Sequence, residues 1–310
     1  MFRILAPPLI WGYIWTIMAH KSGFVNIIGS PNVGKSTLMN ELVGERLSII
    51  TSKAQTTRHR ILGIVNEDEY QICFSDTPGV LIPSYKLQEG MMQFVDSALK
   101  DADLFLFVTD FFEDELNDPE ILERLKKTSA PILVLINKLD LIDQQKMEAK
   151  TEAWSKKLPE AHILPISALH KANVDLVMEW IKARLPEGPP YYDKQALTDK
   201  PERFFASEII REKILQQFKK EIPYSVEVVV EEFKESQDIT RIRAIIYVAR
   251  DSQKGIIIGH QGQALKSIGV DARIDLEKFF ETHIFLDLFV KVNKDWKSDE
   301  RKLKRFGYFH

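Results

Sequence analysis

The segment Gly29–Ser36 constrains the fold of this chain more than any other stretch, because it reads Gly-Ser-Pro-Asn-Val-Gly-Lys-Ser. This sequence matches the phosphate-loop spacing of glycine, four residues, glycine, lysine and serine or threonine. An apolar run at 24–28 precedes it, and residues 37–43 have the composition of a helix. The two glycines let successive backbone N–H groups converge on a phosphate at a helix N-terminus. The segment therefore predicts a strand, loop and helix that bind a nucleoside triphosphate.

The residues of this loop have separable chemical roles. Lys35 is expected to reach the β- and γ-phosphates, and the Ser36 hydroxyl is expected to ligate Mg²⁺. The alternative is a chance strand, turn and helix containing glycine and lysine, and the agreement of all three parts in register argues against it. The predicted nucleotide contacts here are Gly29, Ser30, Pro31, Asn32, Val33, Gly34, Lys35, Ser36 and Thr37.

A second nucleotide motif, Asp76-Thr77-Pro78-Gly79, closes a predicted strand at 70–75. A carboxylate at a strand end can hold Mg²⁺ through water, and a glycine N–H can meet the γ-phosphate. The D-x-x-G form is common by chance, but here it stands forty residues after Ser36 and at a strand terminus. The predicted nucleotide contacts in this stretch are Asp76, Thr77, Pro78, Gly79 and Val80.

The stretch Asn137-Lys138-Leu139-Asp140 follows an apolar run at 132–136 and indicates which base is bound. Guanine presents N1–H and N2–H₂ donors side by side. The Asp140 carboxylate can accept both, whereas adenine offers the wrong edge and leaves the charge unpaired. Lys138 is expected along the face of the base, and Asn137 is expected to tie this loop to the phosphate loop. A turn followed by a helix-capping aspartate is the alternative. The backbone N–H for the guanine oxygen is assigned to Ser167, Ala168 and Leu169.

The rest of the first 185 residues alternates apolar runs with helical stretches. The continuous apolar runs at 104–108 and 132–136 suit parallel strands that are covered on both faces. Because strand and helix alternate along the chain, a doubly wound α/β sheet is the favoured fold. The helices between the later strands are expected at about 118–127, 144–157 and 173–184.

The pattern changes after the proline-rich stretch at 185–190, which cannot continue a helix. This change predicts a smaller α+β domain in the last third of the chain. Its expected elements are a helix near 203–220, strands at 225–233 and 239–249, the loop Gly259-His260-Gln261-Gly262, a long helix, a strand at 284–292 and a basic helix.

The nucleotide motifs and their order resemble the translation-factor-related GTPases, and within them the Era-like family of bacterial GTPases. The segment Gln55-Thr56-Thr57-Arg58 is similar to the first switch of that family, and Gly259–Gly262 is similar to the G-x-x-G loop of a KH domain. The resemblance implies a P-loop GTPase domain at 18–185, a linker at 186–200 and a type II KH domain at 201–310. It implies catalytic roles for Lys35, Thr57, Asp76 and Gly79. The implied Mg²⁺ ligands are Ser36, Thr57 with Thr56 as the substitute, and Asp76 through water.

A KH domain binds about four nucleotides by clamping their backbone across the G-x-x-G loop. Ile256, Ile257 and Ile258 are expected to form part of the apolar floor under the bases. Charge gives mild support, because residues 201–310 sum to +2 while the first 200 sum to −5. The predicted RNA contacts are Lys254, Gly255, Ile257, Ile258, Gly259, His260, Gln261, Gly262 and Lys266.

The resemblance implies a GTP-hydrolysing, RNA-binding switch that acts in ribosome assembly. Its expected partners are GTP and GDP, the 16S rRNA near its 3′ end and the 30S subunit, and the chain is expected to be monomeric. It implies a cytoplasmic protein and allows peripheral association with the inner membrane. Two other functions stay open: a phosphotransferase that uses the same loop, and a GTP-dependent scaffold at the membrane.

Val80 stands where signalling GTPases place a water-orienting glutamine directly after D-x-x-G. Valine cannot orient water or stabilise charge, so intrinsic hydrolysis is expected to be slow. An apolar residue at this position is typical of the resembled family. Asn32 resembles the asparagine that potassium-dependent relatives use as a ligand, which makes K⁺ a second candidate cofactor beside Mg²⁺.

Residues 1–17 contain an apolar run at 9–17 that is too short to span a bilayer. We interpret Met18 as the true start and 1–17 as an upstream extension of the reading frame, with an interfacial membrane anchor as the alternative. The single cysteine, Cys73, cannot form an internal disulfide and lies in an alternating run, which favours a strand residue in a reducing compartment.

Overall fold

The computed structural model describes residues 20–113, 116 and 118–309. Residues 1–17 lie outside this described part of the chain, and so do both interpretations of them as an upstream extension or a membrane anchor. Within it, no helix has the length and apolar character needed to cross a bilayer.

The first domain is built on a six-stranded sheet whose order is β2-β3-β1-β4-β5-β6. All neighbouring pairs are parallel except β2 and β3, which are antiparallel. The sheet therefore has the doubly wound form that the alternation predicted, and the phosphate loop leaves its interior strand β1. The strands are β1 (Lys21–Ile28), β2 (Ile61–Asn66), β3 (Tyr70–Asp76), β4 (Leu104–Asp110), β5 (Ile132–Asn137) and β6 (His162–Pro165).

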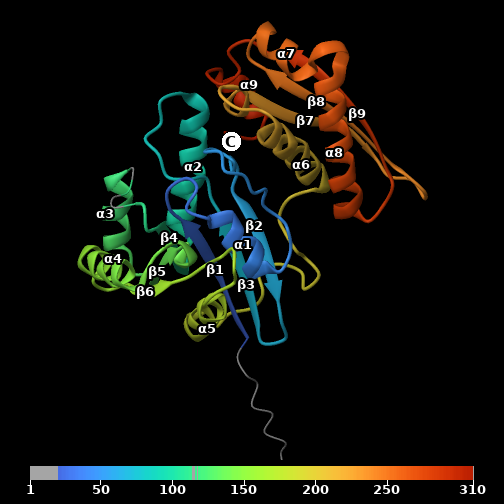
Figure 1. Ribbon diagram of the computed structural model, residues 1–310. Coiled ribbons are helices and arrows are strands. Elements are labelled where there is room, and N and C mark those ends of the chain that lie inside the picture. The colour runs from blue at the N-terminus through green and yellow to red at the C-terminus, as the bar shows by residue number, and fades with distance from the viewer. Residues whose placement is uncertain (1–19, 114–115, 117, 310) are drawn as a thin grey trace, which may run out of the picture.

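Helices cover both faces of this sheet (Figure 1). Helices α1 (Lys35–Val43) and α5 (Val174–Arg184) pack on one face. Helices α2 (Lys86–Asp101), α3 (Pro119–Lys127) and α4 (Gln144–Lys157) pack on the other. Every residue of β4 is buried, as expected for a strand covered on both sides. Asp118 and Asp143 start α3 and α4 by accepting N–H groups of the first turn.

The predicted linker packs along the edge of the first domain. The N–H of Ile64 in the edge strand β2 donates to the Leu197 carbonyl at 2.8 Å, and the N–H of Leu62 donates to Asp199 at 3.0 Å. The amide oxygen of Gln71 accepts from the N–H groups of Tyr191 and Tyr192. The first two bonds occupy backbone groups that the edge strand β2 otherwise leaves open, and the Gln71 bonds attach the linker to the neighbouring strand β3.

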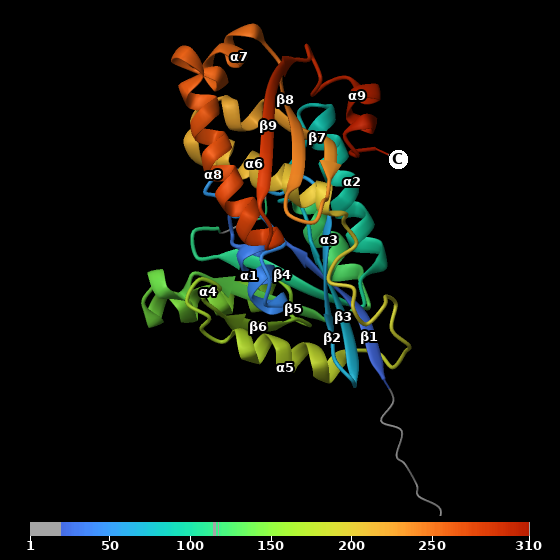
Figure 2. The same ribbon diagram turned by 90° about the vertical axis from the view of Figure 1, so that its right-hand side faces the viewer.

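The second domain has a three-stranded sheet of order β7-β8-β9, with β7 and β8 antiparallel and β8 and β9 parallel. Helices α6 and α8 pack against one face of it, and this core is separate from that of the first domain (Figure 2). The predicted helix–strand–strand–helix–loop–helix–strand–helix order is confirmed. The elements are α6 (Glu202–Gln217), the short helix η2 (Ile222–Tyr224), β7 (Val226–Lys234), β8 (Thr240–Val248), α7 (Asp251–Ile258), η3 (His260–Gly262), α8 (Gln263–Phe280), β9 (Ile284–Val292) and α9 (Glu300–Arg305).

The second domain sits above the carboxyl ends of the parallel strands, on the side where the phosphate loop lies (Figures 1 and 2). A small apolar cluster joins Leu87 and Met91 of α2 to Trp296, Leu303 and Tyr308 near the C-terminus. The two domains are therefore in direct contact on the nucleotide side of the sheet.

Candidate functional site

Close packing around two glycines shapes the phosphate loop. Gly34, which precedes α1, has φ of 100°, and a Cβ atom there lies 2.2 Å from Nδ2 of Asn137. A Cβ at Gly29 lies 1.9 Å from the Val108 carbonyl oxygen. Any side chain at either position therefore displaces the loop from the neighbouring strands. The consequence is a backbone cradle whose N–H groups open at the N-terminus of α1.

Lys35 is buried at the base of this cradle, and its Nζ donates to the Ser30 carbonyl at 2.8 Å. Burial lowers the pKa of Lys35 to about 8, against the opposing attraction of Asp76 and Glu113. A polyphosphate supplies the negative charge that this desolvated ammonium lacks.

The predicted Mg²⁺ ligands meet at one point, although they come from three separate segments. The Ser36 hydroxyl donates to Oδ2 of Asp76 at 2.7 Å and lies 2.8 Å from the Thr57 hydroxyl. Thr57 also donates to Asp76 at 3.3 Å. The second carboxylate oxygen of Asp76, Oδ1, is buried with no hydrogen-bond partner among the described residues. Burial also raises the pKa of Asp76, while Lys35 opposes that rise.

Oxygen donors of this kind fit a hard divalent cation such as Mg²⁺. Among the described residues, no three His, Cys, Asp or Glu side chains form a metal-binding group. Beside nucleotides, Mg²⁺ is usually held by one or two carboxylates together with phosphate and water oxygens, and Asp76 is the carboxylate at this point.

The segment after β3 packs directly on the phosphate loop. The Thr77 hydroxyl donates to the Ile27 carbonyl at 2.7 Å, and a Cβ at Gly79 lies 2.7 Å from backbone atoms of Pro31. The Val80 side chain is fully buried, and its N–H donates to the Gly29 carbonyl at 3.0 Å. Val80 thus has no donor left for a phosphate and no group that can orient water.

Asn137 ties the predicted base loop to the phosphate loop, as the sequence predicted. Its Nδ2 donates to the Val33 carbonyl at 2.8 Å, and its Oδ1 accepts the Ala168 N–H at 2.9 Å. The Ser167 N–H donates to Ala172. Leu169 makes no backbone N–H bond within the described chain, so it is the open donor of this loop.

The Asp140 carboxylate is fixed in position by a hydrogen bond and can accept others. The Ser167 hydroxyl donates to its Oδ1 at 2.6 Å, and this bond is the main reason why the pKa of Asp140 is lowered. The carboxylate is therefore charged at neutral pH. Nζ of Lys138 forms an ion pair with Asp110 at 2.6 Å, which holds the lysine beside the same loop.

A pocket of about 430 Å³ of empty space opens between the phosphate loop and the segment around Thr57. Its lining includes the predicted residues Pro31, Asn32, Gly34, Lys35, Ser36, Thr37, Thr56, Thr57 and Gly79. It also includes Ile49, Ile50, Thr51 and Gln55, which were not predicted as contacts. Gln55 stands at the start of the segment that resembles the first switch, whereas Ile49, Ile50 and Thr51 had only their position between the first helix and the next strand as a signal.

The G-x-x-G loop joins α7 to α8 in the second domain. Gly259 has φ of 72°, and its Cβ position lies 2.6 Å from Cβ of Ala264, so glycine is required at this turn. His260, Gln261 and Lys266 are exposed. Ile257 is fully buried in the domain core, so its predicted contact with bases was wrong. Ile256, on the outer side of α7, is 45% exposed.

A groove of about 770 Å³ runs from this loop between α8 and β9. Its lining combines apolar and basic side chains, which suits bases and phosphates respectively. Residues of the groove that were not predicted lie on α8 and β9, beyond the motif, and they include Leu265, Val270, Arg273, Leu286 and Leu288.

Comparison with known proteins matches both domains. A family model described as 50S ribosome-binding GTPase matches residues 24–138, and a KH domain model matches residues 221–297. GTPase Era of Syntrophus aciditrophicus is 47% identical over 291 residues, which make up 93% of this chain and 95% of that protein. GTPase Era of Geotalea daltonii is 45% identical over 289 residues, covering 93% of this chain and 97% of that protein.

Two solved structures of Era cover 94% of this chain and their own full length, each at 40% sequence identity. One is an Aquifex aeolicus Era variant bound to GDP·AlF₄⁻, with a TM-score of 0.89. The other is Era in complex with MgGDPNP and nucleotides 1506–1542 of 16S ribosomal RNA, with a TM-score of 0.90. Because similarity of this extent runs through both domains, the chain belongs to the Era family of GTPases and is an enzyme that hydrolyses GTP.

Proposed function

We propose that this GTPase is an RNA-binding switch in assembly of the 30S ribosomal subunit, with its KH domain on the 16S rRNA near the 3′ end. The observation that carries the proposal is the likeness to an Era structure that contains both MgGDPNP and that part of 16S rRNA. The groove beside the G-x-x-G loop supports it, because a KH domain holds single-stranded RNA at such a loop.

In this proposal the phosphates of GTP lie in the cradle of Gly29–Thr37, and Lys35 neutralises their charge. Ser36, Thr57 and Asp76, the last through water, would hold Mg²⁺ there. When bound, the cation offsets phosphate charge. Asp140 accepts the N1–H and N2–H₂ groups of guanine, and the 167–169 loop donates to the guanine oxygen.

We also propose that hydrolysis is slow, since Val80 is buried and cannot orient water. K⁺ is the proposed second cofactor, with Asn32 as its ligand. Asn32 lies in the phosphate loop with φ of 64° and lines the nucleotide pocket. Hydrolysis rates that are equal in sodium and potassium buffers of the same ionic strength would remove K⁺ from the proposal.

We place the domain boundaries at 18–185 for the GTPase domain and 201–310 for the KH domain, with the linker at 186–200. The contacts of Leu197 and Asp199 with β2 support a linker that stays on the first domain. We infer action in the cytoplasm, where GTP and 16S rRNA are found, and a monomeric protein.

The proposal is tested by measuring the affinity for a 16S rRNA 3′-end fragment with GTP, GDP and a non-hydrolysable GTP analogue. Gly262→Asp places a negative charge at the G-x-x-G loop, where a Cβ meets no neighbouring atom within 4 Å. Gly262→Asn is the matched control, since both side chains tolerate the left-handed backbone there.

We expect tighter RNA binding with the GTP analogue than with GDP. We expect Gly262→Asp to weaken RNA binding at least tenfold more than Gly262→Asn, with hydrolysis unchanged in both variants. RNA affinity that is the same in all nucleotide states, and the same in both variants, would contradict the proposal.

A further inference from the structure

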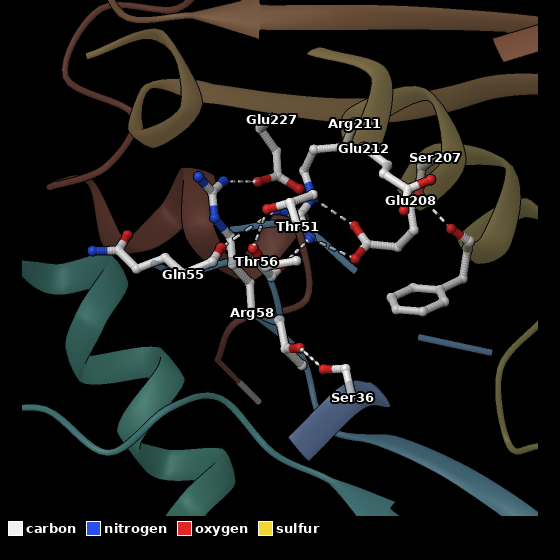
Figure 3. A network of polar contacts seen from close by, with 12 residues as sticks. Ser36, Thr51, Gln55, Thr56, Arg58, Ser207, Glu208, Arg211, Glu212 and Glu227 are labelled. Atoms are coloured by element: carbon white, nitrogen blue, oxygen red, sulfur yellow. Dashed lines mark hydrogen bonds and ion pairs between the residues drawn. The ribbon is translucent and has the colours of Figure 1, made fainter. Parts of the chain in front are cut away.

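The segment that carries Thr57 is held by the second domain on both sides of this residue (Figure 3). It runs from Thr51 to Arg60 and forms the last part of the connection between α1 and β2. The Thr57 hydroxyl is turned toward Ser36 and Asp76 in the first domain. Its immediate neighbours, Thr56 and Arg58, are bound to residues of the other domain.

Arg211 on α6 holds the preceding residue. Its Nη2 donates to the Thr56 carbonyl, and its Nη1 lies 3.5 Å from the Gln55 carbonyl. The guanidinium is itself fixed by Glu208, which accepts from Nε at 2.7 Å and from Nη2 at 2.6 Å. Both side chains are almost fully buried, at 1% and 7% exposure, so this fork is rigid and shielded from water.

Arg58, the residue after Thr57, is fixed in the reverse arrangement. Here a side chain of the first domain enters the second domain. Its guanidinium donates to the Val226 and Pro223 carbonyls at 2.7 and 2.9 Å, and to Glu227 at 3.1 Å. Glu227 also accepts the Tyr308 hydroxyl at 2.8 Å. The Arg58 side chain is wholly buried.

The position of the Thr57 hydroxyl follows from these contacts. Consecutive Cα atoms lie about 3.8 Å apart, so fixing the carbonyl of Thr56 and the side chain of Arg58 leaves Thr57 little freedom. A displacement of a reacting group by about 1 Å can lower a rate by about 100-fold. The second domain therefore has a direct route to the geometry of the GTP site.

We propose that Arg211 of the second domain, braced by Glu208, is a positioning residue for GTP hydrolysis. It holds the Thr56 carbonyl so that the Thr57 hydroxyl stays beside Ser36 and Asp76. The inference rests on the proposed role of Thr57 as a Mg²⁺ ligand. It also gives RNA a means of changing hydrolysis, because any shift of α6 relative to the first domain moves Thr57.

The test compares full-length variants by kcat and KM for GTP and by a binding readout. That readout is the Mg²⁺ concentration needed for half-maximal binding of a fluorescent non-hydrolysable GTP analogue. Glu208→Gln combined with Arg211→Gln removes both charges, so that no single buried charge remains unpaired. Arg211→Lys keeps the charge but loses the planar fork. Arg46→Ala is the control, because Arg46 pairs with Glu212 and Asp275 across the same interface without contacting residues 55–58.

The neutral pair is expected to lower kcat by about 10- to 100-fold with little change in KM at saturating Mg²⁺. It should also raise the half-maximal Mg²⁺ concentration at least threefold. Arg211→Lys should fall between this variant and the wild type, and Arg46→Ala should stay within twofold of the wild type. Adding Arg211→Lys to Thr57→Ala should change neither kcat nor the half-maximal Mg²⁺ concentration further, since both substitutions act through the Thr57 hydroxyl.

A folded neutral pair with wild-type kcat and wild-type Mg²⁺ dependence would overturn the inference. If the neutral pair does not fold, wild-type values for Arg211→Lys would overturn it instead. Failure of the proposed Mg²⁺-ligand role of Thr57 gives a different result: Thr57→Ala would then leave kcat and the Mg²⁺ dependence unchanged, whatever the Arg211 variants do.

Discussion

Replacing Asp140 by asparagine is expected to change which purine nucleotide this GTPase prefers. The carboxylate is accessible, and its Oδ1 already accepts the Ser167 hydroxyl at 2.6 Å. Asparagine can keep that bond through its oxygen, which places the –NH₂ group where Oδ2 faces the base. A donor then meets the N–H donors of guanine. Xanthine carries a carbonyl oxygen at C2, and the same –NH₂ group can donate to it.

The size of the effect follows from the hydrogen bonds that are lost. A hydrogen bond to a charged group contributes about 1.5 to 3 kcal/mol, and guanine offers two such donors to Asp140. The carboxylate is partly exposed to solvent, with 25% of the side chain accessible, so the lower value applies to each bond. The expected loss is about 3 kcal/mol, or roughly 100-fold in GTP affinity.

The assay is competition of GTP and XTP against a fluorescent GDP analogue, for the wild type and for Asp140→Asn. His170→Ala is the matched control, because its ring lies 3.7 Å from the Asp140 carboxylate but is not assigned a base contact. We expect the control to stay within threefold of the wild type. GTP affinity that changes less than threefold in Asp140→Asn, or equal losses for GTP and XTP, would refute the assignment of Asp140 to the base.

Other perturbations test the same site and the interface beside it. Lys35→Ala should abolish tight GTP binding, measured by calorimetry, and unchanged affinity would count against the phosphate-loop assignment. The pKa of Lys35 is lowered to about 8, so its ammonium is lost as pH rises through 8. GTP affinity should therefore fall about fivefold between pH 8 and 9, with proton uptake on binding. Gly34→Ala should disrupt the loop through its Cβ clash with Asn137 and lower GTP affinity by more than tenfold, with the fold retained by circular dichroism. Burial lowers the pKa of His59 to about 3, so the folded state binds fewer protons than the unfolded state between pH 3 and 6.5, and stability falls as pH drops in that window. When the pH is lowered from 7 to 5, the free energy of urea unfolding of His59→Phe should rise relative to that of the wild type by up to about 2 kcal/mol. Unfolding free energies that change in parallel with pH in the two proteins would contradict this.

Much of the nucleotide site was predictable because each of its parts is a short contiguous motif with a local backbone requirement. The cradle at 29–36 and the tie from Asn137 to Val33 are examples. The error at Ile257 has a simple cause. Residues 251–258 form a helix, in which neighbouring side chains point in different directions, so Ile256 faces outward while Ile257 enters the core.

The order of strands and helices, the nucleotide chemistry and the KH-like loop were thus determined by the sequence alone, through hydrophobic period and local spacing. Only the tertiary structure decided that Arg211 meets Thr56 and that Arg58 enters the second domain. The physical reason is distance along the chain: these partners are more than 150 residues apart, and each is an ordinary charged or polar residue in its own neighbourhood. The contact between the GTP site and the RNA-binding domain exists only once both domains have folded and packed together.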